Sequence, residues 1–207
     1  MKKRILNMKQ MTQTPYVNLY SLDTLYRDGS YGNYYVASRK KGISNLKLNT
    51  KENAPDGVII YSLYGDNHDK VVLIRQYRYT IDDYIYEFPA GLVEENEDFV
   101  QGAIREMKEE TGLSLTVCTT PAYFSKPFFT SIGMTDESCS MVFGYSSGEP
   151  TQIYQEGSED IEIVLADKNE VKRILKEENV SMMCAHMLLH FLNCKSGNPF
   201  DFLEMEE

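Results

Sequence analysis

The chain of 207 residues is long enough to bury one sizeable core and a small additional subdomain. Its formal net charge of −10 disfavours a nucleic-acid backbone as a partner, because like charges repel. The four cysteines lack metal or redox spacing, no secretory signal follows the basic N-terminus, and no apolar run is long enough for a bilayer, so we expect a soluble, cytoplasmic protein that contacts no membrane.

The N-terminal residues, 1–54, predict a small β subdomain. Runs rich in tyrosine and valine at Tyr16–Tyr20 and Tyr31–Ser38 are strand candidates, and the turn-like Arg27–Ser30 separates them. The residues before them carry little pattern beyond positive charge and are either frayed or a leading strand. Residues 39–57 are polar and are predicted to form a loop. A hairpin of this size is only marginally stable alone, so it should pack on the rest of the chain or on a partner subunit.

Residues 55–207 combine predicted strands with predicted helices, which is typical of the α/β class. Period-2 runs bounded by turn residues predict the strands Val58–Tyr64, Lys70–Tyr79, Tyr84–Phe88, Ser114–Thr119, Ser138–Tyr145 and Ile161–Leu165. Helical periodicity predicts helices at Asn169–Glu177 and Met182–Asn193. A long loop is expected at Ser125–Glu137, and an acidic tail at Phe200–Glu207.

The stretch Gly91–Leu113 is strongly acidic, with seven carboxylates in twenty-three residues. Asp98 is a good N-cap with Gln101 at the N3 position, which makes a capping box. Apolar residues then recur with a period of 3.6, and Gly112 stands where a helix end needs a residue able to take positive φ. These signals predict a helix between Asp98 and Gly112.

Three glutamates share one face of this helix. Glu106 and Glu110 are i,i+4 neighbours, and Glu109 is i,i+3 from Glu106, so like charges cost about 0.2–0.5 kcal/mol per pair. A divalent cation would neutralise them, and oxygen-only ligands suit Mg²⁺ first and Mn²⁺ second. The alternative is a solvated acidic face, which is the usual state of a Glu-rich helix.

The spacing of the fixed residues in this stretch resembles the Nudix box, Gly-x5-Glu-x7-Arg-Glu-aliphatic-x-Glu-Glu-x-Gly-aliphatic. The matching residues are Gly91, Glu97, Arg105, Glu106, Met107, Glu109, Glu110, Gly112 and Leu113. At ordinary residue frequencies such a match arises on the order of once in 10⁸ windows, which disfavours the solvated-face alternative. The resemblance to the Nudix hydrolases implies an α/β/α sandwich with a mixed sheet.

The resemblance also implies roles for the residues of the box, because a divalent cation can bridge phosphate oxygens and activate water. The metal ligands it implies are Glu106, Glu109, Glu110 and the backbone carbonyl of Ala90. Glu109 and Arg105 are also expected among the catalytic residues, the arginine by holding the carboxylates in place. Glu97 is expected either to orient this arginine or to build the turn before the helix.

Four further segments resemble the ADP-ribose pyrophosphatase subgroup, namely Arg75–Arg78, Glu87–Gly91, Ser131–Glu137 and Ser158–Glu162. In that subgroup the catalytic base is a carboxylate on a loop after the box, a position that Glu137 matches, with Asp136 as the second choice. The alternative for Glu137 is an ordinary solvated acid.

Arg75, Arg78 and Glu87 are the expected substrate-binding residues, since arginine forks suit phosphate and ribose. Because Arg75 and Arg78 are three residues apart on a predicted strand, they point to opposite faces, and at most one should reach a given pocket.

These features predict an Mg²⁺-dependent enzyme that hydrolyses the pyrophosphate bond of a nucleoside diphosphate sugar, most simply ADP-ribose to AMP and ribose 5-phosphate. We expect a homodimer whose N-terminal strands complete the partner's site. The nearest alternative is a hydrolase of another sugar nucleotide, such as a UDP- or GDP-hexose. An alternative of another class is a sensor that binds ADP-ribose without cleaving it.

Overall fold

The computed structural model describes residues 4–194 and 199–203, and the chain folds into two compact units. Unit 1 consists of Met1–Asp56 and Pro127–Cys139, and unit 2 of Gly57–Lys126 and Ser140–Glu207. Unit 1 is therefore built from two separate parts of the chain, the second of which lies inside the range 55–207 that the sequence assigns to the second domain.

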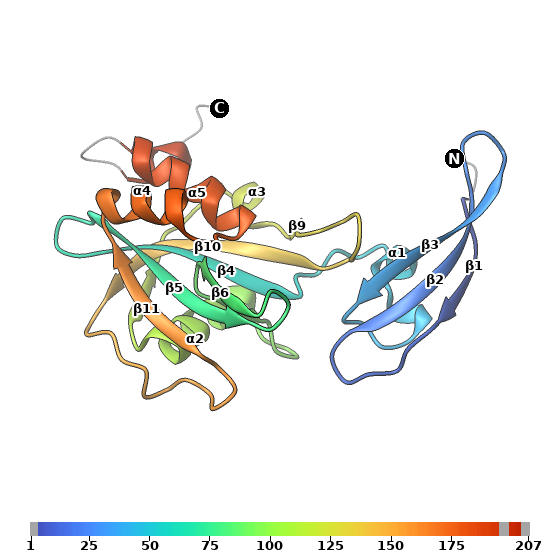
Figure 1. Ribbon diagram of the computed structural model, residues 1–207, viewed down its shortest axis with the longest axis horizontal. Coiled ribbons are helices and arrows are strands. Elements are labelled where there is room, and N and C mark those ends of the chain that lie inside the picture. The colour runs from blue at the N-terminus through green and yellow to red at the C-terminus, as the bar shows by residue number, and fades with distance from the viewer. Residues whose placement is uncertain (1–3, 195–198, 204–207) are drawn as a thin grey trace. The chain divides into compact units, whose positions relative to one another are not determined.

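Unit 1 contains a three-stranded antiparallel sheet in the order β1-β2-β3 (Figure 1). The strands are β1 (Ile5–Gln10), β2 (Asn18–Leu25) and β3 (Tyr31–Ser38). The third strand has the predicted bounds, the predicted Tyr16–Tyr20 strand overlaps β2, and the leading-strand alternative is correct for β1. Residues 1–3 of that leading segment lie outside the described residues.

The stretch predicted as a polar loop after β3 contains two short helices, η1 (Ile43–Asn45) and α1 (Lys47–Thr50). Leu46, which joins them, is fully buried, as is Tyr20 of β2. The three large apolar residues of this segment, Ile43, Leu46 and Leu48, are too few to give a clear periodic signal, so the sequence pattern did not show these helices.

A buried ion pair in the first part of unit 1 also binds Ser138 of the second part. The Nζ atom of Lys47 lies 2.7 Å from Oδ2 of Asp56, and both side chains are less than a tenth exposed. The same Asp56 oxygen accepts the Ser138 N–H at 3.0 Å, and Lys40 reaches the other oxygen at 3.0 Å. Burial alone would raise the pKa of Asp56, but the hydrogen bonds from Lys47, Ser138 and Lys40 outweigh it and lower the pKa.

Unit 2 is organised around a mixed sheet whose main path is β11-β5-β4-β10-β8. Strands β6, β7 and β9 pair with β5, β4 and β10 off this path. The strands are β4 (Gly57–Tyr64), β5 (Lys70–Arg78), β6 (Asp83–Glu87), β7 (Ala90–Leu92), β8 (Ser114–Val117), β9 (Phe128–Phe129), β10 (Ser138–Ser147) and β11 (Ile161–Ala166). Strand β9 lies in unit 1, and strand β10 begins in unit 1 and continues into unit 2.

Helices cover both faces of this sheet. The helices are α2 (Phe99–Thr111), α3 (Ala122–Ser125), α4 (Lys168–Glu177), α5 (Met182–Asn193) and the short η2 (Asp201–Leu203). Helix α2 lies on one face, and α4 and α5 lie on the other (Figure 1). The predicted α/β/α sandwich with a mixed sheet and a small antiparallel β sheet is therefore confirmed.

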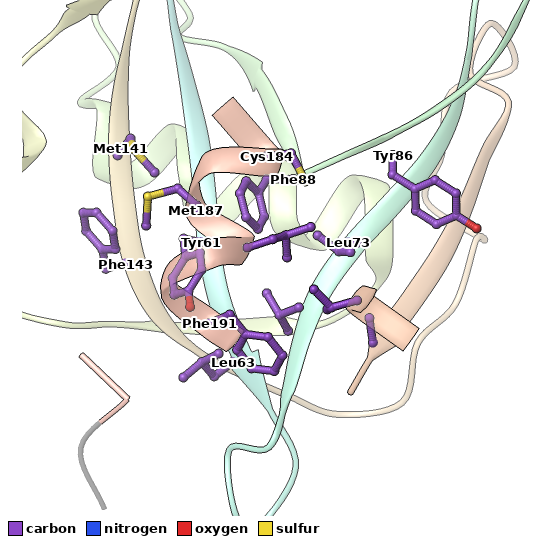
Figure 2. Close-up of a cluster of buried hydrophobic side chains, with 14 of the residues drawn as sticks. Tyr61, Leu63, Leu73, Tyr86, Phe88, Met141, Phe143, Cys184, Met187 and Phe191 are labelled. Atoms are coloured by element: carbon purple, nitrogen blue, oxygen red, sulfur yellow. The ribbon is translucent and has the colours of Figure 1, made fainter. Parts of the chain in front are cut away.

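Each face of the sheet has its own hydrophobic core. On the α2 face, Val58, Ile60 and Val72 of the strands pack with Ala103 and Met107 of the helix. On the opposite face, side chains of α5 lie among those of β4 and β5 (Figure 2). The labelled members of that second core are Tyr61, Leu63, Leu73, Tyr86, Phe88, Met141, Phe143, Cys184, Met187 and Phe191.

The remaining differences from the predicted elements are short pieces. Strands β7 and β9 and helix α3 are two to four residues long, and they depend on pairing or packing partners that are distant in the sequence. Of the predicted acidic tail, Asp201–Leu203 forms η2, and residues 204–207 lie outside the described residues. None of the helices in the described ranges is both long and apolar enough to cross a bilayer.

Replacing Lys47 with methionine should lower the free energy of unfolding by about 3 kcal/mol near neutral pH, because it leaves the buried Asp56 carboxylate without its nearest cation. The folded-state pKa of Asp56 is depressed, so the pair stabilises the fold above the ordinary value of 3.8. This contribution is lost as the pH falls through the lower folded-state pKa. Urea unfolding monitored by circular dichroism, at neutral pH and below pH 3.8, should show the difference shrinking with acid.

Lys40→Met is the matched control, since Lys40 contacts the same carboxylate with a side chain that is 37% exposed. An exposed pair contributes at most about 1 kcal/mol, so this variant should lose much less stability. Equal losses in the two variants would contradict the assignment of the stabilisation to the buried pair.

Candidate active site

Helix α2 begins and ends at the predicted residues. The Asp98 side chain accepts the N–H of Val100 at 2.9 Å, which caps the first turn. At the other end Gly112 has a φ of 72°, and its N–H donates to the carbonyl of Lys108 at 2.9 Å. A Cβ atom on Gly112 would stand 2.3–2.9 Å from atoms of Thr151, so only glycine fits there. The two fixed ends set the positions of the glutamates between them.

The guanidinium of Arg105 is the centre of the acidic face. Its Nε and Nη2 atoms donate to the two oxygens of Glu97, each at 2.9 Å, and Nη2 also donates to the carbonyl of Leu92. Its Nη1 atom donates to Glu106 and to Glu109, each at 2.8 Å. The hydrogen bonds from Arg105 are the main cause that lowers the pKa of Glu97 to about 2. One arginine therefore holds three carboxylates at once.

Glu110 has the opposite environment. It is 3% exposed, and one carboxylate oxygen accepts the Ala90 N–H at 3.0 Å. Burial raises the pKa of Glu110 well above its ordinary value, and the negative charges of Glu106 and Glu159 add to this effect. The Ala90 hydrogen bond and the positive charge of Arg78 act in the other direction but do not cancel it. A nearby cation would stabilise the charged form of this buried carboxyl group, which its acidic neighbours destabilise.

Gly91 makes room for the carboxylate of Glu106. A Cβ atom on Gly91 would stand 1.9 Å from Cδ of Glu106 and 2.0 and 2.3 Å from its two oxygens. The side chain of Glu106 is 12% exposed, and burial raises its pKa although Arg105 opposes this. Any other residue at position 91 would displace the Glu106 carboxylate from the space beside Gly91, which we call its seat.

The donor atoms at this site fit a hard divalent cation, although they are not assembled as a cluster of ligands. Within residues 4–194 and 199–203, no three His, Cys, Asp or Glu side chains are grouped as metal ligands. Arg105 bridges Glu106 and Glu109, and the carboxylate of Glu110 turns toward β7. The seat beside Gly91 and the buried carboxyl of Glu110 provide oxygen donors with excess negative charge, as Mg²⁺ and Mn²⁺ prefer. A cation would compete with Arg105 for the carboxylates of Glu106 and Glu109.

Strand alternation separates the two arginines of β5. Arg78 pairs with Glu87, with 2.7 Å between Nε and Oε2, and its charge acts on the box from the α2 side of the sheet. Arg75 lies on the other face, where it pairs with Glu162 at 3.1 Å and its guanidinium stacks over the ring of Tyr84 at 4.0 Å. Of the predicted substrate-binding residues, Arg78 and Glu87 are therefore brought toward the box.

Glu137 lies in unit 1, whereas the box lies in unit 2. Its carboxylate is 2.6 Å from Nε of Arg39 and accepts a hydrogen bond from the Thr130 hydroxyl at 3.2 Å. Glu137 and Arg39 border a cavity of about 210 Å³ within unit 1. The role of Glu137, and of the neighbouring Asp136 as its second choice, stays a prediction.

The sequence patterns place Glu159 in the Ser158–Glu162 segment but give it no role, and its charge acts on the box within unit 2. Its charge raises the pKa of both Glu106 and Glu110. It lies two residues before the buried Ile161, the first residue of β11, so the period-2 alternation of an extended chain places the two on one face. Alternation along the Ser158–Glu162 segment is a signal in the sequence that would have assigned Glu159 to the opposite face from Ser158 and Asp160.

The fold and the site define a three-layer α/β protein in which an acidic helix faces a short glycine-containing strand. Residues 54–183, more than half of the chain, match the family model described as NUDIX domain. The chain belongs to the NUDIX domain family.

Several known proteins are similar to this chain. A putative nudix hydrolase 2 of Caenorhabditis elegans is 35% identical over 134 residues, which are 60% of this chain and 58% of that protein. An ADP-ribose pyrophosphatase of Saccharomyces cerevisiae is 33% identical over 95 residues, 44% of this chain and 41% of that protein. The chain thus matches about half of the length of these relatives. A crystal structure titled ADP compounds hydrolase shares the fold, with a TM-score of 0.65, 17% identity and 93% of both chains covered.

Replacing Arg105 with lysine should raise the pKa of Glu97 from about 2 toward its ordinary value of 4.5. A lysine ammonium is a point charge and cannot make the two-point contact of a guanidinium with a carboxylate. Carbon-detected NMR titration of the glutamate carboxyl groups measures this change.

Arg173→Lys is the matched control, since Arg173 makes a comparable set of hydrogen bonds to Glu170 on α4. It should leave the titration of Glu97 unchanged. A Glu97 carboxyl that still titrates near pH 2 in Arg105→Lys would show that the contact with Arg105 does not control it.

Proposed function

We propose that this protein hydrolyses the pyrophosphate bond of nucleoside diphosphate sugars, and that ADP-ribose is the substrate, giving AMP and ribose 5-phosphate. The observation that carries the proposal is the acidic face of α2, where Glu106 and Glu110 lie one helical turn apart and the negative charge of the loop residue Glu159 acts on both. The names of two relatives, an ADP-ribose pyrophosphatase from yeast and an ADP-sugar pyrophosphatase from mouse, support this substrate class.

Mg²⁺, or Mn²⁺ in its place, is the proposed cofactor. The residues that would hold it are Glu106, Glu109, Glu110 and the carbonyl of Ala90. When bound, such a cation neutralises phosphate oxygens and lowers the pKa of a water molecule. Arg105 keeps the carboxylates oriented through its anchor on Glu97, and Gly91 keeps the seat of Glu106 open.

The proposed substrate-binding residues on the box side of the sheet are Arg78 and Glu87. The Arg78 fork can donate to phosphate oxygens, and Glu87 holds this fork in place at 2.7 Å. Because Arg78 also carries positive charge toward the buried Glu110, it offsets part of the repulsion that a pyrophosphate would meet on approaching so many carboxylates.

Two loop carboxylates compete for the role of catalytic base. Glu137 is supported by the resemblance of its loop to that of ADP-ribose pyrophosphatases. Glu159 is supported by its place in unit 2, where its negative charge acts on Glu106 and Glu110 and its carboxylate accepts the Glu156 N–H at 3.0 Å. A base must come within hydrogen-bond reach of the water it deprotonates. We favour Glu159 and keep Glu137, which Arg39 neutralises in this structure, as the competing assignment.

We also propose a homodimeric, cytoplasmic enzyme. Unit 1 exposes several large aromatic side chains, among them Tyr16, Tyr31 and Tyr35, which are each more than half exposed and could pack on a partner subunit. Cys118, Cys139 and Cys184 are thiols that form no disulfide, as is usual in a reducing compartment.

Incubation of the purified protein with ADP-ribose and Mg²⁺ should release AMP and ribose 5-phosphate, and chelation of the metal should abolish the reaction. Chromatography with mass detection identifies the products, and UDP-glucose and GDP-mannose serve as matched substrates. Faster turnover of either hexose nucleotide would overturn the ADP-ribose assignment but keep the reaction class. Tight binding of ADP-ribose by calorimetry without any cleavage would instead favour the sensor.

Glu159→Gln should lower kcat by about 10²–10⁴-fold, the usual contribution of a general base, whereas Glu137→Gln should stay within about threefold of the wild type. The amide keeps the size of each side chain and removes only its basicity. Steady-state kinetics with the substrate that the wild type cleaves fastest measures both variants. The reverse pattern would assign the base to Glu137.

A further inference from the structure

The loop that carries Glu159 is fastened at its first end to the C-terminal end of α2. The Thr151 N–H donates to the carbonyl of Thr111 at 2.9 Å, and the Gln155 side chain donates to the carbonyl of Glu110 at 2.6 Å. These bonds satisfy carbonyl groups that the end of a helix leaves unpaired. They fix the loop as far as Gln155, four residues before Glu159.

At its second end the loop is fastened by Asp160, which is held twice. Its carbonyl accepts the Tyr77 N–H at 3.0 Å, which extends the β5–β11 ladder by one residue. Its carboxylate accepts the hydroxyl of Tyr84, a residue of β6, at 2.7 Å. The ring of Tyr84 is in turn covered by the guanidinium of Arg75 at 4.0 Å, and Arg75 pairs with Glu162, two residues beyond Asp160.

These contacts lie on the face of the sheet opposite to α2. In an extended chain successive side chains point to opposite faces, so fixing Asp160 toward Tyr84 directs Glu159 toward α2. On its own side of the sheet, the carboxylate of Glu159 accepts the N–H of Glu156 at 3.0 Å. The network behind the sheet therefore acts together with this turn to fix the position of the carboxylate in front of it.

We propose that Tyr84, backed by Arg75, is a positioning residue for Glu159. It acts through Asp160 and does not touch the substrate. Arg75 thereby has a role on the far face of the sheet in place of the substrate contact expected for it. The inference rests on the proposed role of Glu159 in catalysis.

Tyr84→Phe tests this inference, because it keeps the ring under Arg75 and removes only the hydroxyl that holds Asp160. We expect kcat to fall about tenfold, with KM within about twofold of the wild type, since a hydrogen bond to a charged group is lost without any change in the substrate contacts. Tyr77→Phe is the matched control. Its ring lies 5.5 Å from that of Tyr84, and its hydroxyl binds another carboxylate, that of Asp82 in the β5–β6 turn. It should leave kcat and KM unchanged.

A double-mutant cycle shows whether Tyr84 acts through Glu159. In the Glu159→Gln background, Tyr84→Phe should cause no further loss of kcat, because there is no base left to position. A further tenfold loss in that background would overturn the inference, and so would a normal kcat for Tyr84→Phe in the wild-type background. If Glu159→Gln itself keeps full activity, the proposed role of Glu159 fails, and that result is distinct from an impaired Glu159→Gln beside a normal Tyr84→Phe.

Amide hydrogen exchange across residues 155–162 measures the anchoring without turnover. Tyr84→Phe should speed exchange in this segment severalfold, while Tyr77→Phe should not. Unchanged exchange in Tyr84→Phe would show that the hydroxyl does not hold the loop, and it would overturn the inference even if kcat were lowered.

Discussion

The contact of Arg105 with its carboxylates is the interaction on which the acidic site depends. Without a cation, Glu97, Glu106 and Glu109 would repel one another and spread into solvent, because like charges at helical spacing destabilise each other. The guanidinium binds Glu97 through two parallel hydrogen bonds and uses its remaining donors for the other two. Its planar fork makes this geometry possible, which an ammonium group could not reproduce. The protein thus keeps these acidic groups together through an internal cation, the guanidinium of Arg105.

The glutamates of α2 and of the loop before it differ in their pKa values. The pKa of Glu97 lies near 2 because Arg105 donates to both its oxygens, whereas that of Glu110 is raised because it is buried among acids. These differences divide the glutamates into one that anchors the arginine and others that favour a cation. The division follows from position relative to the sheet, since Glu110 points inward and Glu97 lies on the loop before the helix.

The two faces of the sheet carry different groups of residues, with the acidic box on the α2 face and residues that hold the loops in place on the opposite face. Residues of β5 and β11 alternate between the α2 face, which carries Arg78, and the opposite face, which carries Arg75 and its partners. The two arginines of one short segment therefore have different partners. The loop between β10 and β11 follows the same rule, because the charge of Glu159 acts on Glu106 and Glu110, whereas Asp160 binds Tyr84. In unit 1, Glu137 forms an ion pair with Arg39, and all residues of the box belong to unit 2.

The sequence by itself determined the family, the α/β class and the helix from Asp98 to Gly112, because periodicity, caps and the box spacing are local properties of the chain. It also separated Arg75 from Arg78, since alternation needs only a strand. It could not show that Pro127–Cys139 folds with the N-terminal strands or that Glu159 lies near the box. Those facts depend on pairings between distant segments, and hydrogen bonds and burial across such distances leave no periodic mark in the sequence.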